Sequence, residues 1–461
     1  MTPDIAGCKA ALAAFDLEDH PAIVRQKSRD FYWYSPILKR QLDGITADFV
    51  ITPRSEEEVS AILAICWAHN VPVTTRGAGT GNYGQAMPLS GGAILHMRNL
   101  NQILDIGDRH VVCQSGMVIA DLEQAVRVQG REIRLFPSTT SSATIGGFIA
   151  GGSSGVGAIR WGGLRNLDNI NRVRLVTMEQ VPRTIELTGR DIYKAAHAYG
   201  VNGVITQLEL PIDPAVEWVD VIIGVDSFEH STTLAIALGE DAAIDMRMLS
   251  SFEAPIGQRY FKRYRPYIVE GEAQILTMVA ATSMSALVDH LASVPHATLR
   301  FRQDEDSADQ RLPALYEMAW NHTTLRAIKV DPAITYLQMM FPRETALANI
   351  ARVKASFGEE LLLHFEFTRI GGLVTPVAMP LVQFTTEERL EDLIVQLEAM
   401  GLPVFNPHRV TLEEGGMKQT DANQLAFKHE TDPKGLLNPG KMIAWSQPDW
   451  TPTPGKTFLF T

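Results

Sequence analysis

A glycine-rich run at residues 76–84, RGAGTGNYG, is the first part of the chain whose residue types suggest a chemical task. Glycine reaches backbone conformations with positive φ, so consecutive N–H groups in such a run can turn toward one anion. The spacing from Gly79 to Gly84 also matches G-x-G-x-x-G, a dinucleotide fingerprint that requires a following helix. Here Pro88, Ser90, Gly91, Gly92 and a strand-like stretch follow instead. The run therefore predicts a phosphate-binding loop of another kind, with a structural turn as the alternative.

A second run, from Gly146 to Gly163, holds eight glycines in eighteen residues. Each glycine inside regular structure costs roughly 0.5–1 kcal/mol relative to alanine. Such a density indicates a backbone that must come close to a flat ligand. A mobile linker is the alternative, but Phe148, Ile149 and Trp161 lie within the run, and linkers do not carry core residues.

The elements that must position these runs can be read from the pattern around them. Residues 49–52 predict a short strand. Ser55 and Glu58 form a capping box, with each side chain expected to bond the other residue's backbone N–H, ahead of an amphipathic helix to about His69. Residues 71–75 predict the next strand, which leads into the first run. A helix is expected over residues 121–128, ended by Gly130.

A boundary is expected at residues 208–214, where two prolines close a strand and glycine becomes sparse afterwards. Beyond it, strands are predicted at 218–225, 275–281, 336–341, 361–368 and 378–384, with a helix over 386–400. Strands that alternate with helices indicate an α+β sheet covered by helices on one face.

Taken in order, the motifs resemble one flavoprotein family. TP-x-S-x-x-EV from Thr52, RGAGTG from Arg76, ATIGG from Ala143, GVNGVIT from Gly200 and DP-x-GLLNPGK from Asp432 span residues 52–441. This set is similar to the vanillyl-alcohol oxidase / p-cresol methylhydroxylase (PCMH-type) FAD-binding superfamily. The last motif resembles its D-lactate dehydrogenase and glycolate-oxidase D-subunit branch. The resemblance implies a two-subdomain FAD-binding domain with a substrate-binding cap domain.

The resemblance also implies which positions hold FAD: the first loop at the pyrophosphate, 137–155 along the ribityl chain and ring, 204–205 at the adenosine half, and the closing motif at the flavin. The implied residues are Arg76, Gly77, Ala78, Gly79, Thr80, Gly81, Asn82, Gly84, Pro137, Ser138, Thr139, Thr144, Ile145, Gly146, Gly147, Gly151, Ser154, Gly155, Val204, Ile205, Asn438 and Lys441.

Two positions depart from the family pattern. Members with a histidine-linked flavin carry His where this chain has Thr80, so FAD is expected to bind non-covalently. The hydroxy-acid branch has Glu-His-Gly upstream of the closing motif, and its histidine helps to hold a metal and the substrate. This chain has Glu413, Glu414, Gly415 and Gly416 there, so no metal is expected.

The substrate side needs a base for the hydroxyl proton when a hydride leaves carbon. His322, within WNHTT, is the first candidate, against a helix-surface or structural role. On the strand 361–368, His364 shares one face with Glu366 and Thr368, a face that lines the pocket or is merely solvated. Arg369 at its end could clamp a carboxylate. His408 is a weaker candidate.

Composition excludes other classes. The chain has 461 residues and a net charge of -12, which argues against nucleic-acid binding despite one basic, aromatic run at 259–267. Three scattered cysteines form neither a disulfide framework nor a metal site. Neither a signal peptide nor a membrane helix is visible, so a cytoplasmic protein is expected.

We therefore predict an N-terminal segment and FAD domain at 1–213, a cap domain with an antiparallel sheet at 214–425, and a returning segment at 426–461. The leading function is FAD-dependent oxidation of a small hydroxylated substrate, foremost a D-2-hydroxy acid. The alternatives are an oxidase of a sugar, alcohol or aromatic compound, an FAD-carrying subunit active only in a complex, and a nicotinamide-dependent enzyme. The electron acceptor stays open, and a homo-oligomer or a partner subunit is compatible with the sequence.

Overall fold

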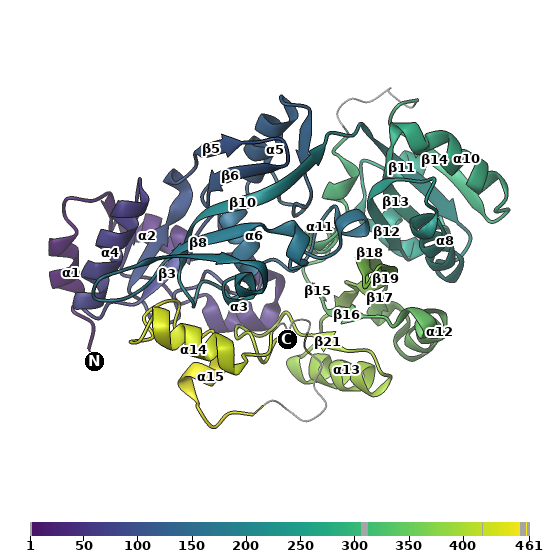
Figure 1. Ribbon diagram of the computed structural model, residues 1–461. Coiled ribbons are helices and arrows are strands. Elements are labelled where there is room, and N and C mark those ends of the chain that lie inside the picture. The colour runs from purple at the N-terminus through teal and green to yellow at the C-terminus, as the bar shows by residue number, and fades with distance from the viewer. Residues whose placement is uncertain (1, 306–311, 417, 452–457, 459–461) are drawn as a thin grey trace.

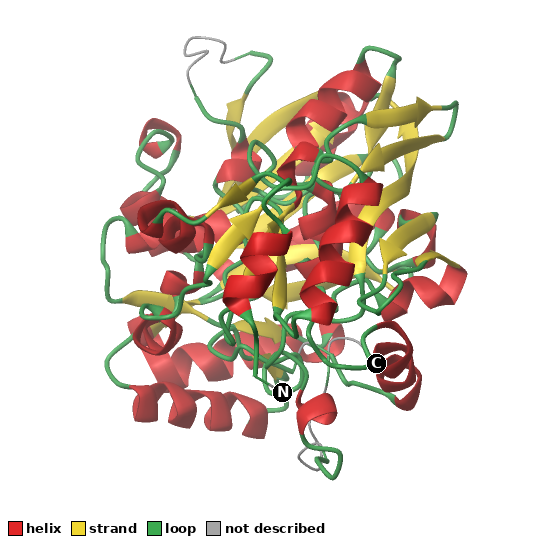
Figure 2. Cartoon of the chain, turned by 90° about the vertical axis from the view of Figure 1, so that its left-hand side faces the viewer, coloured by secondary structure: helices red, strands yellow, loops and turns green. Residues whose placement is uncertain are grey.

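The structure is a computed structural model that describes residues 2–305, 312–416, 418–451 and 458. Figure 1 shows the N-terminal half of the chain on one side, the middle of the chain on the other, and the C-terminal segment returning beneath the first half. Turned by 90°, the molecule shows helices in front of part of its strands (Figure 2). Within these described residues, no helix combines the length and the apolar character needed to cross a lipid bilayer.

The first sheet carries the strand that leads into the first glycine loop. Its order is β1 (Leu17–Glu18), β2 (Phe49–Ile51), β4 (Ala93–His96) and β3 (Val73–Arg76), and β4 pairs in parallel with both β2 and β3. Helix α4 (Glu56–Ala68) connects β2 to β3 and begins at Ser55, whose Oγ accepts the N–H of Glu58 at 3.2 Å. The other half of the predicted capping box is wrong: Glu58 accepts the N–H of Arg54 at 2.8 Å, one residue before Ser55.

The second sheet is antiparallel and lies under the second glycine run. Its order is β5 (Ile103–Ile106), β6 (His110–Gln114), β10 (Val204–Pro214), β8 (Arg172–Val176) and β9 (Thr184–Thr188), and β7 (Arg131–Ile133) pairs with the end of β10. Helix α5 (Ile119–Arg127) packs on this core and is followed by Gly130 at φ +69°. The long strand β10 ends at Pro214, where the boundary was expected.

The third sheet spans residues 218–405 and is antiparallel in every pair, as predicted. Its order is β14 (Ala297–Arg302), β11 (Trp218–Val225), β13 (Ala273–Ala280), β12 (Met246–Phe252), β18 (His364–Ile370), β19 (Leu373–Ala378), β16 (Gln338–Met340) and β21 (Val404–Phe405). One face packs against α8 (Phe228–Glu240), α10 (Met284–Ala292), α12 (Ala346–Phe357) and α13 (Glu387–Ala399). Because side chains alternate along a strand, the opposite face meets α9 (Ala254–Tyr260), α11 (Asn321–Ile328) and the first half of the chain.

Three predicted strands are divided between two sheets. A small sheet, β15 (Ile334–Tyr336), β20 (Leu381–Gln383) and β17 (Leu361–Leu362), takes one end of each run, and the eight-stranded sheet takes the other. The chain crosses at Leu337, Leu363 and residues 379–380, where Leu337 donates to the carbonyl of Pro380 and Met379 to that of His364. The alternation of apolar residues shows no interruption at these positions. Each run was therefore predicted as one strand where the structure has two.

The C-terminal segment adds itself to the first sheet. Leu437 forms a parallel bridge with Val73. The N–H of Val73 donates to the carbonyl of Leu436, and the N–H of Asn438 donates to the carbonyl of Val73, each at 2.8 Å. Helix α14 (Ala422–Thr431) precedes this bridge, and Asp432 caps the turn between them by accepting from Leu436 and Leu437. The closing motif therefore lies beside the strand that carries the first glycine loop. Short helices complete the chain: α1 (Ile5–Ala11), α2 (Pro21–Lys27), α3 (Pro36–Leu42), α6 (Ile145–Gly151), α7 (Ala158–Trp161) and α15 (Ile443–Ser446).

Candidate cofactor and active site

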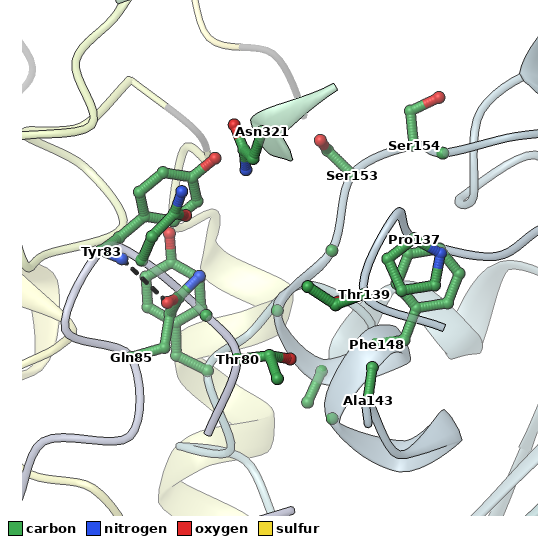
Figure 3. Close-up of a pocket in the computed structure, with 18 of the residues that line it drawn as sticks. Thr80, Tyr83, Gln85, Pro137, Thr139, Ala143, Phe148, Ser153, Ser154 and Asn321 are labelled. Atoms are coloured by element: carbon green, nitrogen blue, oxygen red, sulfur yellow. Dashed lines mark hydrogen bonds between the residues drawn. The ribbon is translucent and has the colours of Figure 1, made fainter. Parts of the chain in front are cut away.

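A cavity of about 580 Å³ lies between the two glycine runs and the third sheet. Figure 3 shows Tyr83, Gln85 and Asn321 toward one end of it and Pro137, Thr139 and Phe148 toward the other. Its walls come from segments far apart in the sequence, including residues 77–86, 137–155 and 320–322. A cavity of this kind, between a loop-rich domain and a sheet, is the usual place for a ligand.

The first glycine loop offers free backbone donors to this cavity. The N–H groups of residues 78–82 donate no hydrogen bond to another described group of the chain. Behind the loop, Arg76 donates to the carbonyls of Arg29 at 2.5 Å and Ala78 at 3.0 Å. Gly79 has φ +72°, and a Cβ there would lie 2.2 Å from the Arg76 guanidinium carbon. Arg76 thus supports a nest of N–H groups suited to an anion, and only glycine fits at position 79.

The second glycine run contains a helix that the sequence did not reveal. Helix α6 begins at Thr144, whose Oγ1 accepts the N–H of Gly147 at 3.3 Å. A Cβ at Gly77 would lie 2.0 Å from that same Oγ1, and one at Gly146 would lie 2.5 Å from the Cβ of Ser115. The glycines therefore let the two loops pack on each other as well as approach a ligand.

Unpartnered hydroxyl groups also fit a polar ligand here. Thr75, Ser115 and Ser154 line the cavity, and their buried hydroxyl oxygens have no hydrogen-bond partner among the described residues. A buried polar group without a partner costs about 1–3 kcal/mol, so native proteins rarely retain three together without a ligand or water. Together with the free N–H groups, they give this wall the donors that a pyrophosphate and a flavin ring would bind.

Most of the expected cofactor positions line the cavity, and six do not. Those that line it are Gly77, Ala78, Gly79, Thr80, Gly81, Asn82, Pro137, Ser138, Thr139, Thr144, Gly146, Gly147, Gly151, Ser154, Gly155 and Ile205. Those that lie behind it are Arg76, Gly84, Ile145, Val204, Asn438 and Lys441.

The two C-terminal residues support the loop from outside. The Asn438 amide donates to the carbonyls of Gln85 at 2.8 Å and Tyr199 at 2.6 Å. Lys441 donates to the carbonyl of Gly84, and burial lowers the pKa of its amine to about 7, against the opposing charge of Asp30. Burial raises the pKa of Asp30 to about 6. Asn438 and Lys441 lie away from the cavity because the bridge to β3 places the closing motif behind the first glycine loop.

Several lining residues escaped the sequence analysis, above all aromatic ones. The aromatic run at residues 31–34 is not among the predicted site residues, yet Phe31 and Tyr34 line the cavity. They belong to an aromatic cluster whose other lining members are Tyr83, Tyr199, Trp320, Met379 and Phe405. Tyr83 stood within the first motif, but nothing in the sequence indicated that residues 31–34 reach the same space.

The cavity also has a neutral polar corner beside these rings. Gln338 donates to the hydroxyl of Tyr83, and burial raises the pKa of that hydroxyl. Asn321 lies next to Tyr83 in Figure 3, and its buried Oδ1 has no partner among the described residues. This corner can donate to or accept from an uncharged group such as a hydroxyl.

The three histidine candidates lie in different surroundings. His322 lines the cavity, and burial, followed by the charges of Arg326 and Lys329, lowers its pKa to about 4. His364 does not line the cavity: it is fully buried and its ring stacks on Phe252 with centroids 4.4 Å apart. His364, Glu366 and Thr368 share one face of the strand, but only Thr368 lines the cavity. His364 and Glu366 lie at the other end of the strand, where neighbouring elements cover them. His408 is buried between Ser35 Oγ at 2.6 Å and the carbonyl of Tyr336 at 2.9 Å.

Arg369 lines the cavity but its guanidinium is engaged elsewhere. It donates to the carbonyls of Ile159 at 3.2 Å, Gly372 at 2.8 Å and Gly239 at 2.8 Å. The bond to Ile159 joins the third sheet to the second glycine run, and the other two hold the guanidinium against α8 and the turn after β18. The side chain therefore does not present a free guanidinium to a carboxylate.

We expect Arg369→Gln to lower stability by about 1–3 kcal/mol, because it leaves buried carbonyls without a donor. The melting temperature measures this effect, and the exposed Arg190→Gln serves as the control. The ratio of KM values for an acidic substrate and its uncharged analogue should stay unchanged. A selective rise of KM for the acid would restore Arg369 as a carboxylate clamp.

No group of three metal-ligating side chains that could hold a metal ion occurs among the described residues. Glu413, at the position of the family's Glu-His-Gly, accepts instead from Thr420 Oγ1 at 2.7 Å and from the N–H groups of Ile443 and Ala444.

Comparison with known proteins identifies the loops. A family model described as FAD binding domain matches residues 47–180, which include both glycine loops. The chain is an FAD-dependent oxidoreductase. FAD is therefore the cofactor, and the free N–H groups, the unpartnered hydroxyl groups and the cavity have the chemistry to hold it.

Relatives of this flavoenzyme include two proteins that it matches over most of their length. It is 25% identical over 444 residues to the glycolate oxidase subunit GlcD of Escherichia coli K12, covering 88% of this chain and 87% of the relative. It is 23% identical over 430 residues to a D-lactate dehydrogenase of Archaeoglobus fulgidus, covering 86% and 91%. A solved structure, alkyldihydroxyacetonephosphate synthase, shares the fold with a TM-score of 0.72 at 15% identity, over 94% of this chain and 84% of that one.

Proposed function

We propose that this flavoenzyme oxidises a D-2-hydroxy acid with an aromatic or other bulky apolar side group. Two relatives, a glycolate oxidase subunit and a D-lactate dehydrogenase, support the hydroxy-acid part of this proposal. The bulky apolar side group of the substrate is inferred from the aromatic cluster on the cavity wall, which includes Phe31, Tyr34, Tyr83, Trp320 and Phe405. Glycolate or lactate would leave such a wall largely uncovered.

We also propose a division of labour along the chain. Residues 1–213 and 426–461 hold FAD, non-covalently because Thr80 offers no imidazole for a link, and residues 214–425 supply the substrate side. Acid precipitation of the purified protein tests the linkage. Flavin colour in the supernatant supports non-covalent binding, and colour in the pellet contradicts it.

The residues of the cavity suggest how the reaction proceeds. FAD, held by the two glycine runs, would supply the acceptor for the hydride that leaves the carbon carrying the hydroxyl group. His322 is neutral at pH 7, because its pKa lies near 4, and can accept the hydroxyl proton at a ring nitrogen. Tyr83 and Asn321 can hold the substrate oxygen, and the surrounding rings exclude water from it.

An aromatic alcohol without a carboxylate is the second candidate. It is favoured by the engagement of the Arg369 guanidinium with three backbone carbonyls, since no clamp is then assigned to an acid.

The two candidates are separated by anaerobic bleaching of the flavin with a panel of substrates. The panel holds glycolate, D-lactate, D-phenyllactate, D-mandelate, benzyl alcohol and a sugar. Fast bleaching by D-phenyllactate or D-mandelate, with slow bleaching by glycolate, is the expected result. Bleaching by benzyl alcohol alone would favour the second candidate. Reduction by dithionite but by no member of the panel would contradict oxidation of these compounds by the chain alone.

The name of one relative, a subunit, raises a further alternative. A chain that turns over only with a partner would be reduced by substrate yet fail to pass electrons onward. Multiple turnovers of the purified chain with oxygen or an artificial dye acceptor would count against that role.

A further inference from the structure

The turn before α11 has an unfavourable backbone conformation. Trp320, at the N-cap of α11, has φ +53° and ψ -144°, in the left-handed half of the map that bulky residues rarely adopt. Such a conformation persists only where surrounding contacts over-determine it. The two residues that follow, Asn321 and His322, line the cavity.

A buried carboxylate holds this turn. The N–H of Trp320 donates to Glu366 Oε1 at 2.6 Å, and Glu366 is only 1% exposed. A backbone N–H on a carboxylate makes a charge-assisted bond, which is about twice as strong as a neutral one. A second bond, from Thr323 Oγ1 to the carbonyl of Met318 at 2.6 Å, closes the turn.

The carboxylate is itself fixed from two sides. Ser250 Oγ donates to Glu366 Oε2 at 2.6 Å, and His364 Nε2 lies 2.6 Å from Oε1. Strands β12 and β18 place these groups, since Ser250 pairs with Glu366 and Phe252 with His364. Because the carboxylate can only accept, His364 carries its proton on Nε2. Stacking on Phe252 then fixes the plane of the imidazole ring.

A role limited to stability does not account for what the turn presents. Replacing buried ionic groups by apolar ones is often neutral for stability, so a polar network in a core is weak evidence for a stabilising role. Here the anchored turn carries two further buried polar atoms, Trp320 Nε1 and Asn321 Oδ1, without a partner among the described residues. Both residues line the cavity, so the turn offers polar atoms to a ligand.

We infer that Glu366 is a positioning residue: its carboxylate, oriented by His364 and Ser250, holds the turn at Trp320 and so directs Asn321 and His322 into the cavity. The effect on turnover rests on the proposed function, whereas the anchoring of the turn does not. This assigns His364 a place behind the site, in contrast to the direct catalytic role predicted from the strand pattern.

Two measurements on one set of holoenzyme variants test the inference. Hydrogen exchange, followed by mass spectrometry of peptides covering residues 319–324, reports the anchoring without any substrate. Anaerobic flavin reduction by the best substrate of the panel reports the site. The variants are Glu366→Ala, which removes the anchor, and Glu366→Gln, which keeps an oxygen for the Trp320 N–H. The matched control is Ser251→Ala on the neighbouring strand β12, which removes a buried hydrogen bond to Ser231 of α8.

Glu366→Ala should speed exchange in this peptide about tenfold or more, because local opening is no longer opposed by the bond. It should lower kcat/KM about 10–100-fold, since small misplacements of catalytic groups have effects of this size. Glu366→Gln should stay within about threefold of the wild type in both. Ser251→Ala should leave both values unchanged.

Unchanged exchange in Glu366→Ala would overturn the anchoring. Faster exchange with unchanged kcat/KM would overturn the role in the site. If no substrate reduces the flavin, faster exchange still supports the anchoring while the proposed function fails. Should Glu366→Ala not fold, Glu366→Asp replaces it, because a side chain shorter by one methylene no longer reaches Trp320.

Discussion

We expect His322→Gln to slow flavin reduction by a saturating substrate about 10²–10⁴-fold, the range that a general base contributes. Glutamine keeps a polar group in the cavity but cannot accept the hydroxyl proton at neutral pH. The visible spectrum of the oxidised flavin should stay unchanged, because the FAD loops do not involve His322. Stopped-flow measurement of flavin bleaching gives the rate directly. His20→Gln, at an exposed histidine, is the control.

The pH dependence gives an independent check with a definite sign. The folded pKa of His322, about 4, lies below the ordinary value of 6.5. The base is therefore neutral at pH 7, and reduction should slow only as the pH falls through about 4. Between about pH 6.5 and 4, His322 binds a proton in the unfolded chain but stays neutral in the folded chain, which favours unfolding. The stability that neutral His322 contributes to the folded state is therefore fully present above pH 6.5 and is lost as the pH falls toward 4. A rate in His322→Gln equal to that of the wild type would exclude it as the base.

Gly77→Ala should weaken FAD binding about 100-fold, or about 2.7 kcal/mol. The new Cβ would lie 2.0 Å from Thr144 Oγ1, the group that caps α6. Either the first loop or the cap of the second must move, and both line the cavity. Backbone strain does not contribute, because Gly77 is not among the residues with positive φ. Fluorescence titration of the apoprotein with FAD measures the dissociation constant.

A second substitution separates the clash from other effects. In Gly77→Ala with Thr144→Ala, the threonine oxygen is gone and the nearest atom of the former contact, Cβ, would lie 3.2 Å away. We expect this pair to recover most of the affinity, less the cost of a lost helix cap, typically about 1 kcal/mol. Gly44→Ala is the control, because a Cβ there meets nothing within 4 Å. A folded Gly77→Ala protein with wild-type affinity for FAD would show that the close contact between Gly77 and Thr144 is not needed for FAD binding.

Most positions predicted for the cofactor line the cavity, because glycine patterns report a local property of the backbone. A run such as 77–82 can form a nest of N–H groups wherever the fold places it, and its residues line the cavity. The closing motif was a weaker guide. Asn438 and Lys441 were expected at the flavin, but the bridge between Leu437 and Val73 places them behind the loop that they support.

The substrate half depended on contacts between distant segments. Alternation along a strand correctly grouped His364, Glu366 and Thr368, but it does not say how far along the strand the cavity extends. Arg369 looked like a carboxylate clamp until the fold brought three carbonyls to it. Phe31 and Tyr34 carried no signal at all, since only tertiary packing brings them to Tyr83 and Phe405.

The sequence by itself determined the two glycine-rich runs and a sheet covered by helices, because both follow from local backbone freedom and periodic burial. The assignment of FAD came from the resemblance that the whole set of motifs carries. Only the tertiary structure decided which side chains meet in the cavity, that His322 lies there, and that His364 stands behind Glu366. Those facts depend on the register between β12 and β18 and on a strained turn at Trp320, and no periodicity in the sequence encodes them.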